Sequence, residues 1–141
     1  MEVIEGKMPF MGYETYYRIV GRRSEKTPLV LLHGGPGSSH NYFEVLDKLA
    51  EIDNRRIIMY DQLGCGKSSI PDDHPELYTK ETWVKELMAL REHLALRKIH
   101  LLGQSWGGML ALIYMCDYHP VGIQSLILSS TLSSASLWSK E

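Results

Sequence analysis

Short apolar runs alternate with amphipathic stretches along most of the chain. Four runs are dominated by β-forming residues and are only about seven residues long: Pro28–Gly34, Arg55–Asp61, Lys98–Gly103 and Ile123–Ser130. A run of this length and composition predicts a strand that is buried on both faces, as in a parallel sheet.

Three stretches between these runs predict helices. They span Ser39–Ile52, Tyr78–Leu96 and Trp106–His119. In the first stretch Phe43, Leu46 and Leu49 recur near helical spacing and predict its buried face, and Ser39 is a candidate N-cap. The third stretch is apolar almost all round, which predicts a helix packed deep in the protein.

The second stretch gives the clearest helical signal in the chain. Its apolar residues recur at i, i+4, i+7 and i+11, with charges on the opposite face. These residues are Trp83, Leu87, Leu90 and Leu94.

The N-terminal segment predicts a β-hairpin, with strands around Val3–Met8 and Thr15–Gly21 and a turn near Gly12. Beyond it, strands and helices alternate, and this alternation indicates βαβ units and a mostly parallel sheet. Residues 1–141 are therefore predicted to form one α/β domain.

Composition narrows the classes of partner. The 141 residues carry a net charge of −2, which gives no electrostatic reason to expect nucleic acid or an anionic membrane surface as a partner. The N-terminus lacks the pattern of a signal peptide, and no apolar run approaches the roughly 20 residues of a membrane span. Cys65 and Cys116 lack metal-ligand spacing and predict two free thiols in a reducing cytoplasm.

The sequence Gly103–Gly107, G-Q-S-W-G, fits the G-x-S-x-G pattern and lies between a predicted strand and a predicted helix. In this context the chain turns sharply, with Ser105 at the tip in a strained conformation and its hydroxyl presented as a nucleophile. Gly103 and Gly107 would let the strand and the helix approach closely. The alternative is a glycine-rich turn with an incidental serine.

A second motif, H-G-G-P-G at His33–Gly37, directly follows the first buried strand. Its glycines allow the backbone to pass close to a substrate, and Pro36 stiffens the loop. We expect the backbone N–H groups of Gly35 and Trp106 to bind the oxyanion of a tetrahedral intermediate. Gly34 completes the loop, and His33 is expected to form structural hydrogen bonds rather than to act as the base. The alternative is a tight loop without a catalytic role.

The segment Asp61–Ser69, D-Q-L-G-C-G-K-S-S, contains the letters G-K-S of a phosphate-binding loop. That motif needs a glycine five residues before its second glycine, and this position is Asp61. Pro71 and Pro75 also interrupt any helix that would follow. Nucleotide binding is therefore disfavoured, and the segment is interpreted as a rigid loop beside the active-site mouth.

Three segments together carry a resemblance to a known family: HGGPGSSHNYF, MYDQLGCGKSS and LLGQSWGGMLALIY. They are similar to the N-terminal half of the α/β-hydrolase fold and, more narrowly, to the bacterial proline iminopeptidases, serine peptidases that release N-terminal proline. The resemblance implies Ser105 as nucleophile, Gly35 and Trp106 as oxyanion donors, Asp61 in a supporting role, and no metal or organic cofactor. It disfavours epoxide hydrolases and haloalkane dehalogenases, which use aspartate where this chain has Ser105.

The rest of the triad is not evident in the sequence. In this fold the acid and the histidine follow the serine, and after Ser105 this sequence has a single histidine, His119, and a single aspartate, Asp117. Both lie at the far end of a helix about 20 Å long. His40 precedes the serine, just beyond the H-G-G-P-G loop, and is not favoured as the base. We therefore expect an incomplete α/β-hydrolase core domain, truncated before the cap and the last strands.

Three functions stay open from the sequence. The first is a peptidase for N-terminal proline, active in a longer or completed chain, and the second is another hydrolase of the same fold, such as an esterase or amidase. The third is an inactive fragment. A polypeptide of these 141 residues alone is expected to be inactive. Its last strand, Ile123–Ser130, would be an apolar edge that favours a C-terminal complementing segment or a second copy of the chain.

Overall fold

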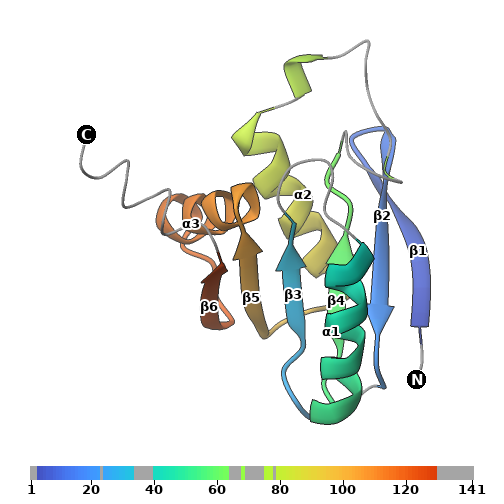
Figure 1. Cartoon of the computed structure of the whole chain (residues 1–141). Helices are drawn as coiled ribbons and strands as arrows, with labels where there is room; N and C mark the ends of the chain where they lie inside the picture. Colours follow the sequence, from blue (N-terminus) through green and yellow to red (C-terminus); the bar gives the residue numbers. More distant parts are fainter. Residues whose placement is uncertain are drawn as a thin grey trace.

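The computed structural model describes residues 3–22, 24–33, 40–63, 68, 75–77 and 79–129, which form a six-stranded sheet with helices on both faces (Figure 1). The strands are β1 (Val3–Phe10), β2 (Tyr13–Val20), β3 (Leu29–Leu32), β4 (Ile57–Tyr60), β5 (Ile99–Gln104) and β6 (Ile123–Ser129). Their order in the sheet is β1-β2-β4-β3-β5-β6. Strands β4, β3, β5 and β6 run parallel, so the predicted mostly parallel α/β sheet is confirmed.

The N-terminal hairpin is also confirmed. Strands β1 and β2 pair antiparallel, with Phe10 opposite Tyr13 across a two-residue turn. Both turn residues have positive φ, 50° at Met11 and 81° at Gly12, as the tightest hairpin turns require. Strand β2 then pairs antiparallel with β4 and joins the hairpin to the parallel part of the sheet.

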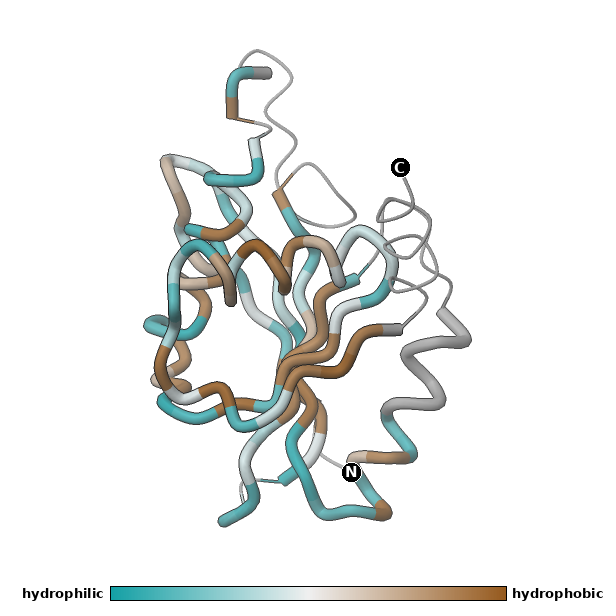
Figure 2. The backbone as a smooth tube through the Cα atoms, turned by 90° about the vertical axis from the view of Figure 1, so that its left-hand side faces the viewer, coloured by the Kyte–Doolittle hydropathy of each residue, from teal (hydrophilic) through white to brown (hydrophobic). Residues whose placement is uncertain are grey.

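Three α-helices cover the sheet, α1 (His40–Asp53), α2 (Lys80–His93) and α3 (Trp106–Tyr118), and a short 3₁₀ helix spans Pro75–Leu77. Helices α2 and α3 lie on one face of the sheet and α1 lies on the other, with the apolar strands between them (Figure 2). Helix α2 begins two residues later than predicted, because the Thr79 hydroxyl accepts a hydrogen bond from Thr82 N at 3.2 Å and caps the helix.

The larger part of the core lies between the sheet and helices α2 and α3. Val30, Ile58 and Leu101 from the strands meet Leu87 and Leu90 of α2, and all five are at most 1% exposed. The predicted stripe on α2 is therefore confirmed at its centre, while its outer members, Trp83 and Leu94, are half-buried. A smaller cluster on the other face includes Leu29, Leu31, Met59 and Ala50.

The predicted buried face of α1 is wrong at Leu49, which is 45% exposed. Ala50 is buried instead and packs against the sheet. Successive helical residues point about 100° apart, so the helix is rotated by roughly one residue from the prediction. The side chains of Phe43 and Leu46, and the candidate cap Ser39, lie outside the described residues.

The prediction that β6 is buried on both faces is also wrong. Its described residues are half-buried or exposed, and Ile127 is 46% exposed. Among the described strands β6 pairs only with β5, so one edge is left uncovered. Helix α3 is likewise buried along one face only, because Cys116 and Asp117 near its C-terminal end are exposed. In the described part of the chain, no helix is long and apolar enough to cross a membrane.

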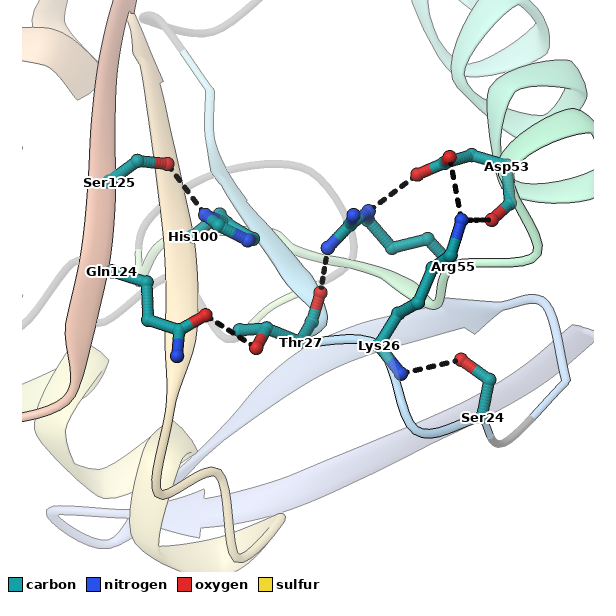
Figure 3. A network of polar contacts seen from close by, with 8 residues as sticks. All are labelled: Ser24, Lys26, Thr27, Asp53, Arg55, His100, Gln124 and Ser125. Atoms are coloured by element: carbon teal, nitrogen blue, oxygen red, sulfur yellow. Dashed lines mark hydrogen bonds and ion pairs between the residues drawn. The ribbon is translucent and has the colours of Figure 1, made fainter.

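Polar groups join the strands at the amino edge of the parallel sheet (Figure 3). The Thr27 hydroxyl donates to Gln124 Oε1 at 2.5 Å, and His100 Nδ1 lies 2.6 Å from Ser125 Oγ. Arg55 donates to the Thr27 carbonyl and pairs with Asp53. These contacts fix the chain where it enters β3, β5 and β6. The candidate site lies at the opposite, carboxyl edge of the sheet.

Candidate active site

Ser105 lies at a sharp turn between β5 and α3, at the carboxyl edge of the sheet. Its backbone has φ 54° and ψ −118°, a region that residues with a side chain rarely adopt. Such strain costs on the order of 1–3 kcal/mol and is concentrated at functional sites. The Ser105 carbonyl accepts hydrogen bonds from Gly108 N and Met109 N, which fix the first turn of the helix, and the residue itself is exposed.

Close backbone contacts around the turn require its two glycines. A Cβ atom on Gly103 would lie 2.5 Å from the Gly107 carbonyl oxygen and 2.6 Å from Gly108 Cα. A Cβ atom on Gly107 would lie 2.0 Å from the Leu32 carbonyl oxygen. The first contact is the close approach of strand and helix that the motif predicts. The second brings the end of β3 against the same turn.

His33, the first residue of the H-G-G-P-G motif, is buried and interlocked with Gln62. Gln62 N donates to His33 Nε2 at 3.0 Å, and Gln62 Nε2 donates to the His33 carbonyl at 2.9 Å. Because Nε2 accepts a hydrogen bond, the proton of the neutral ring is on Nδ1. These contacts support the structural role expected for His33. Gly34, Gly35, Pro36 and Gly37 lie outside the described residues.

The side chain of Trp106, the residue after the serine, is held by two partners. Its indole Nε1 donates to Gln62 Oε1 at 3.1 Å. Its ring packs edge-on against Trp83, with ring centroids 5.6 Å apart. Trp83 in turn donates from Nε1 to the Leu63 carbonyl at 3.1 Å. The backbone of Trp106, the expected oxyanion donor, is thus fixed through its own side chain.

The buried carboxyl group of Glu86, on α2, binds the segment after β4 that carries Gln62 and Leu63. Leu63 N donates to the Glu86 carboxyl at 3.0 Å, and the Thr15 hydroxyl donates to it at 2.5 Å. Glu86 is 0% exposed, and this burial raises its pKa from 4.5 to about 7 in spite of the two hydrogen bonds. The nearby Glu86 also contributes to raising the pKa of the fully buried Tyr60, after the larger effect of burial itself.

Asp61, expected in a supporting role, is attached through its backbone. Its N–H donates to the Tyr16 carbonyl at 2.9 Å, and its own carbonyl accepts from the Ser68 hydroxyl. The Ser68 oxygen also accepts from Tyr16 N at 2.8 Å. The loop after β4 is therefore anchored to β2 at its first residue. Gly64–Lys67 and Ser69 of the same loop lie outside the described residues.

The described histidines other than His33 lie away from the carboxyl edge of the sheet, where Ser105 lies. His100 is at the start of β5 and binds Ser125, and His93 is the last residue of α2 and contacts Tyr17. His119 follows the last turn of α3, at the opposite end from Ser105. The side chain of His40 and all of His74 lie outside the described residues. His93, His100 and His119 therefore lie away from the turn that carries Ser105.

Metal-ligating residues do not cluster in the part of the chain that the structure describes: no group of three or more His, Cys, Asp or Glu residues could hold an ion there. Cys116 is a free, exposed thiol, and Cys65 lies outside the described residues.

Gln62 and Glu86 were not identified from the sequence. Gln62 could have been found from its position, two residues beyond a buried parallel strand and therefore at the edge where Ser105 lies. Glu86 could have been found from helical spacing, because it lies three residues after Trp83 and four before Leu90 on the apolar face of α2.

The strand order, the strained serine and the glycine contacts together define an α/β hydrolase. The family model described as alpha/beta hydrolase fold matches residues 27–141, and the chain belongs to this family.

Curated relatives bear the name proline iminopeptidase, so the narrower resemblance is confirmed. The protein of that name from Lactobacillus acidophilus is 92% identical over 141 residues, which cover 100% of this chain and 48% of the relative. The one from Lactobacillus delbrueckii subsp. lactis is 67% identical over 142 residues, with the same coverage. The chain thus spans about half the length of the curated relatives it matches.

A solved structure shows the same arrangement of elements. The crystal structure of proline iminopeptidase from Mycobacterium smegmatis matches with a TM-score of 0.76 and 37% sequence identity. The match covers 87% of this chain and 42% of that one.

Proposed function

We propose that the protein containing this chain is a serine peptidase that releases N-terminal proline from peptides. The observation that carries the proposal is the strained Ser105 at the turn between β5 and α3, in a chain 92% identical to a protein named proline iminopeptidase. A strained serine at this position is the nucleophile elbow of the fold.

The proposed reaction is acyl transfer. The Ser105 hydroxyl attacks the proline carbonyl and loses its proton to a base, while the backbone N–H groups of Gly35 and Trp106 bind the oxyanion. The intermediate then expels the amine of the next residue, which takes up a proton, and leaves a prolyl ester on Ser105. Water hydrolyses this ester and frees proline. The proposed acyl transfer and hydrolysis use no metal or cofactor.

The base and its orienting acid are proposed to lie in the part of the longer relatives that this chain does not match. His93, His100 and His119 lie away from Ser105, and the acid and histidine of the triad follow the serine in this fold. We accordingly propose that residues 1–141 form an incomplete core domain and that a polypeptide of these residues alone is inactive.

A chimera tests the proposal directly. Residues 1–141 replace the matching segment of the Lactobacillus acidophilus relative, whose remaining sequence supplies the rest of the fold. We expect the chimera to hydrolyse proline β-naphthylamide in preference to the leucine and alanine derivatives. Ser105→Ala is expected to reduce turnover by roughly 10³-fold or more.

The alternative hydrolases of the same fold are distinguished in the same assay. If the chimera cleaves p-nitrophenyl esters well and proline amides poorly, the peptidase proposal is wrong and an esterase is favoured. Robust proline release by the 141-residue polypeptide alone, abolished by Ser105→Ala, would instead contradict the proposed need for the remaining sequence.

A further inference from the structure

We infer that Gln62 is a positioning residue. It holds His33, from which the chain enters the H-G-G-P-G motif, in a fixed position relative to Trp106 in the turn that carries Ser105. This inference rests on the proposed serine-hydrolase function and goes beyond it, because it assigns a role to a residue outside both motifs.

The position of Gln62 in the sheet makes such a link possible. Strands β4, β3 and β5 are neighbours and run parallel, so their carboxyl ends lie side by side. Gln62 follows β4, His33 follows β3, and Trp106 lies just beyond Ser105 after β5. Gln62 therefore reaches across the end of the central strand to the turn on the other side.

Three polar atoms of Gln62 are used in this link. Its backbone N–H and side-chain Nε2 donate to the ring and the carbonyl of His33, and its Oε1 accepts from the Trp106 indole. The residue is 1% exposed, so water does not compete for these bonds. A buried amide with its donor and acceptor both satisfied has one favourable orientation.

The two partners of Gln62 belong to the segments that carry the proposed oxyanion donors. His33 is the residue from which the chain enters H-G-G-P-G, with Gly35 two positions further. Trp106 supplies the other donor. Donors must lie about 2.7–3.1 Å from the oxyanion, and loss of one costs about 10²–10³-fold in turnover. The Gln62 side chain thus joins His33, which leads into the segment with one proposed donor, to Trp106, which carries the other.

The loop segment that carries Gln62 is itself held rigidly. Its neighbour Leu63 donates its N–H to the buried Glu86 carboxyl and accepts from the Trp83 indole through its carbonyl. Both partners belong to α2, and Trp83 also packs on Trp106. Gln62 is therefore anchored to the core on one side and contacts the site on the other.

The chimera carrying Gln62→Met tests this role, because methionine keeps the size and removes the side-chain hydrogen bonds. We expect kcat for proline β-naphthylamide to fall by ~10–100-fold while KM stays within about 2-fold, since the defect lies in transition-state stabilisation. Labelling of Ser105 by a fluorophosphonate is expected to slow by a similar factor. The matched control is Gln124→Met, which removes an exposed glutamine at the amino edge and should leave both rates within about 2-fold (Figure 3).

Gln62→Glu provides a second readout that a merely structural role would not produce. A protonated glutamate can donate to the His33 carbonyl and still accept from Trp106, whereas a carboxylate cannot donate. The ratio of variant to parent kcat, measured well below the melting temperature, should therefore rise as the pH falls. This variant also keeps the inference testable if Gln62→Met does not fold.

Two results would overturn the inference. One is a folded Gln62→Met chimera whose kcat and labelling rate stay within about 2-fold of the parent. The other is a Gln62→Glu defect that does not change with pH. A parent chimera that hydrolyses esters but not proline amides would refute only the proposed substrate, because ester turnover and labelling still report on Gln62. A parent in which Ser105 is not labelled would refute both.

Discussion

The indole nitrogen of Trp106 lies 3.1 Å from the side-chain oxygen of Gln62, although 44 positions separate the two residues in the sequence. This contact joins the loop after β4 to the first residue of α3, across the end of β3. It places the side chain of a proposed oxyanion donor in the same network as His33 and the buried Glu86.

The strain at Ser105 predicts an unusual order of stability. With φ 54° and ψ −118°, position 105 suits glycine better than any residue with a Cβ atom. In the chimera we expect Ser105→Gly to be more stable than Ser105→Ala by about 1 kcal/mol in chemical denaturation. Ala89, inside helix α2, is the control. There Ala89→Gly should be less stable than the parent with alanine, because glycine in a helix interior costs about 1 kcal/mol relative to alanine. A less stable glycine variant at position 105 would contradict the strain.

Gly107→Ala should destabilise the chimera strongly. The new methyl group would lie 2.0 Å from the Leu32 carbonyl oxygen, so β3 and α3 would have to move apart. We expect a loss of roughly 3 kcal/mol or more in the free energy of unfolding. Gly12→Ala is the control, because it meets no atom within 4 Å and carries only the cost of φ 81°, about 1 kcal/mol. Equal effects at the two positions would refute the close contact.

The buried Glu86 predicts a stability that falls as the pH rises. Its pKa is about 7 in the folded state and near the ordinary 4.5 in the unfolded state, so between these values the folded state binds more protons. The free energy of unfolding falls by about 3 kcal/mol over this interval, at about 1.4 kcal/mol per pH unit. The decrease is complete above about pH 7.

Glu86→Gln removes this titration. We expect its stability relative to the parent chimera to improve by about 2–3 kcal/mol between pH 4 and pH 8, measured by urea unfolding at each pH. Glu92→Gln, on an exposed position of the same helix, is the control and should show no such trend. Parallel curves for Glu86→Gln and the parent would show that the carboxyl is not buried as described.

Tyr60→Phe should keep or increase stability. The Tyr60 hydroxyl is buried and has no hydrogen-bond partner among the described residues, so its removal relieves the desolvation cost of a polar group, about 1 kcal/mol. Tyr114 gives the matched comparison, because its hydroxyl accepts from Arg91 Nη1 at 2.9 Å. Tyr114→Phe should therefore lose about 1 kcal/mol. A clear loss of melting temperature in Tyr60→Phe would reveal a partner for its hydroxyl.

The exposed edge of β6 predicts self-association of a polypeptide limited to residues 1–141. Strand β6 pairs only with β5 among the described strands, and Ile127 is 46% exposed on it. Unpaired apolar edges promote association of chains. Light scattering after size exclusion should show oligomers or aggregates, and co-expression with the remaining segment of the Lactobacillus acidophilus relative should suppress them. A monodisperse monomer that melts cooperatively would contradict this expectation.

The order of the elements could be predicted because each strand and helix has a local signal. The run Pro28–Gly34 and the stripe through Leu87 and Leu90 each predicted the right element. The errors concern which face is buried. Leu49 is exposed because α1 is rotated on the sheet, and β6 is exposed because its burial depends on a neighbour rather than on its own composition.

The sequence by itself determined the α/β class, the turn that carries Ser105 and the need for a small residue at Gly103, because backbone geometry and short-range sterics depend on nearby residues. The contact of Gly107 with the Leu32 carbonyl depends on the position of β3 and was decided by the tertiary structure. Only the tertiary structure decided the roles of Gln62 and Glu86. Their hydrogen bonds join residues that lie 23 to 71 positions apart, and such pairs form only after the strands are ordered in the sheet. A polar residue at the end of a strand or on an apolar helix face shows its partner only when the fold brings the two together.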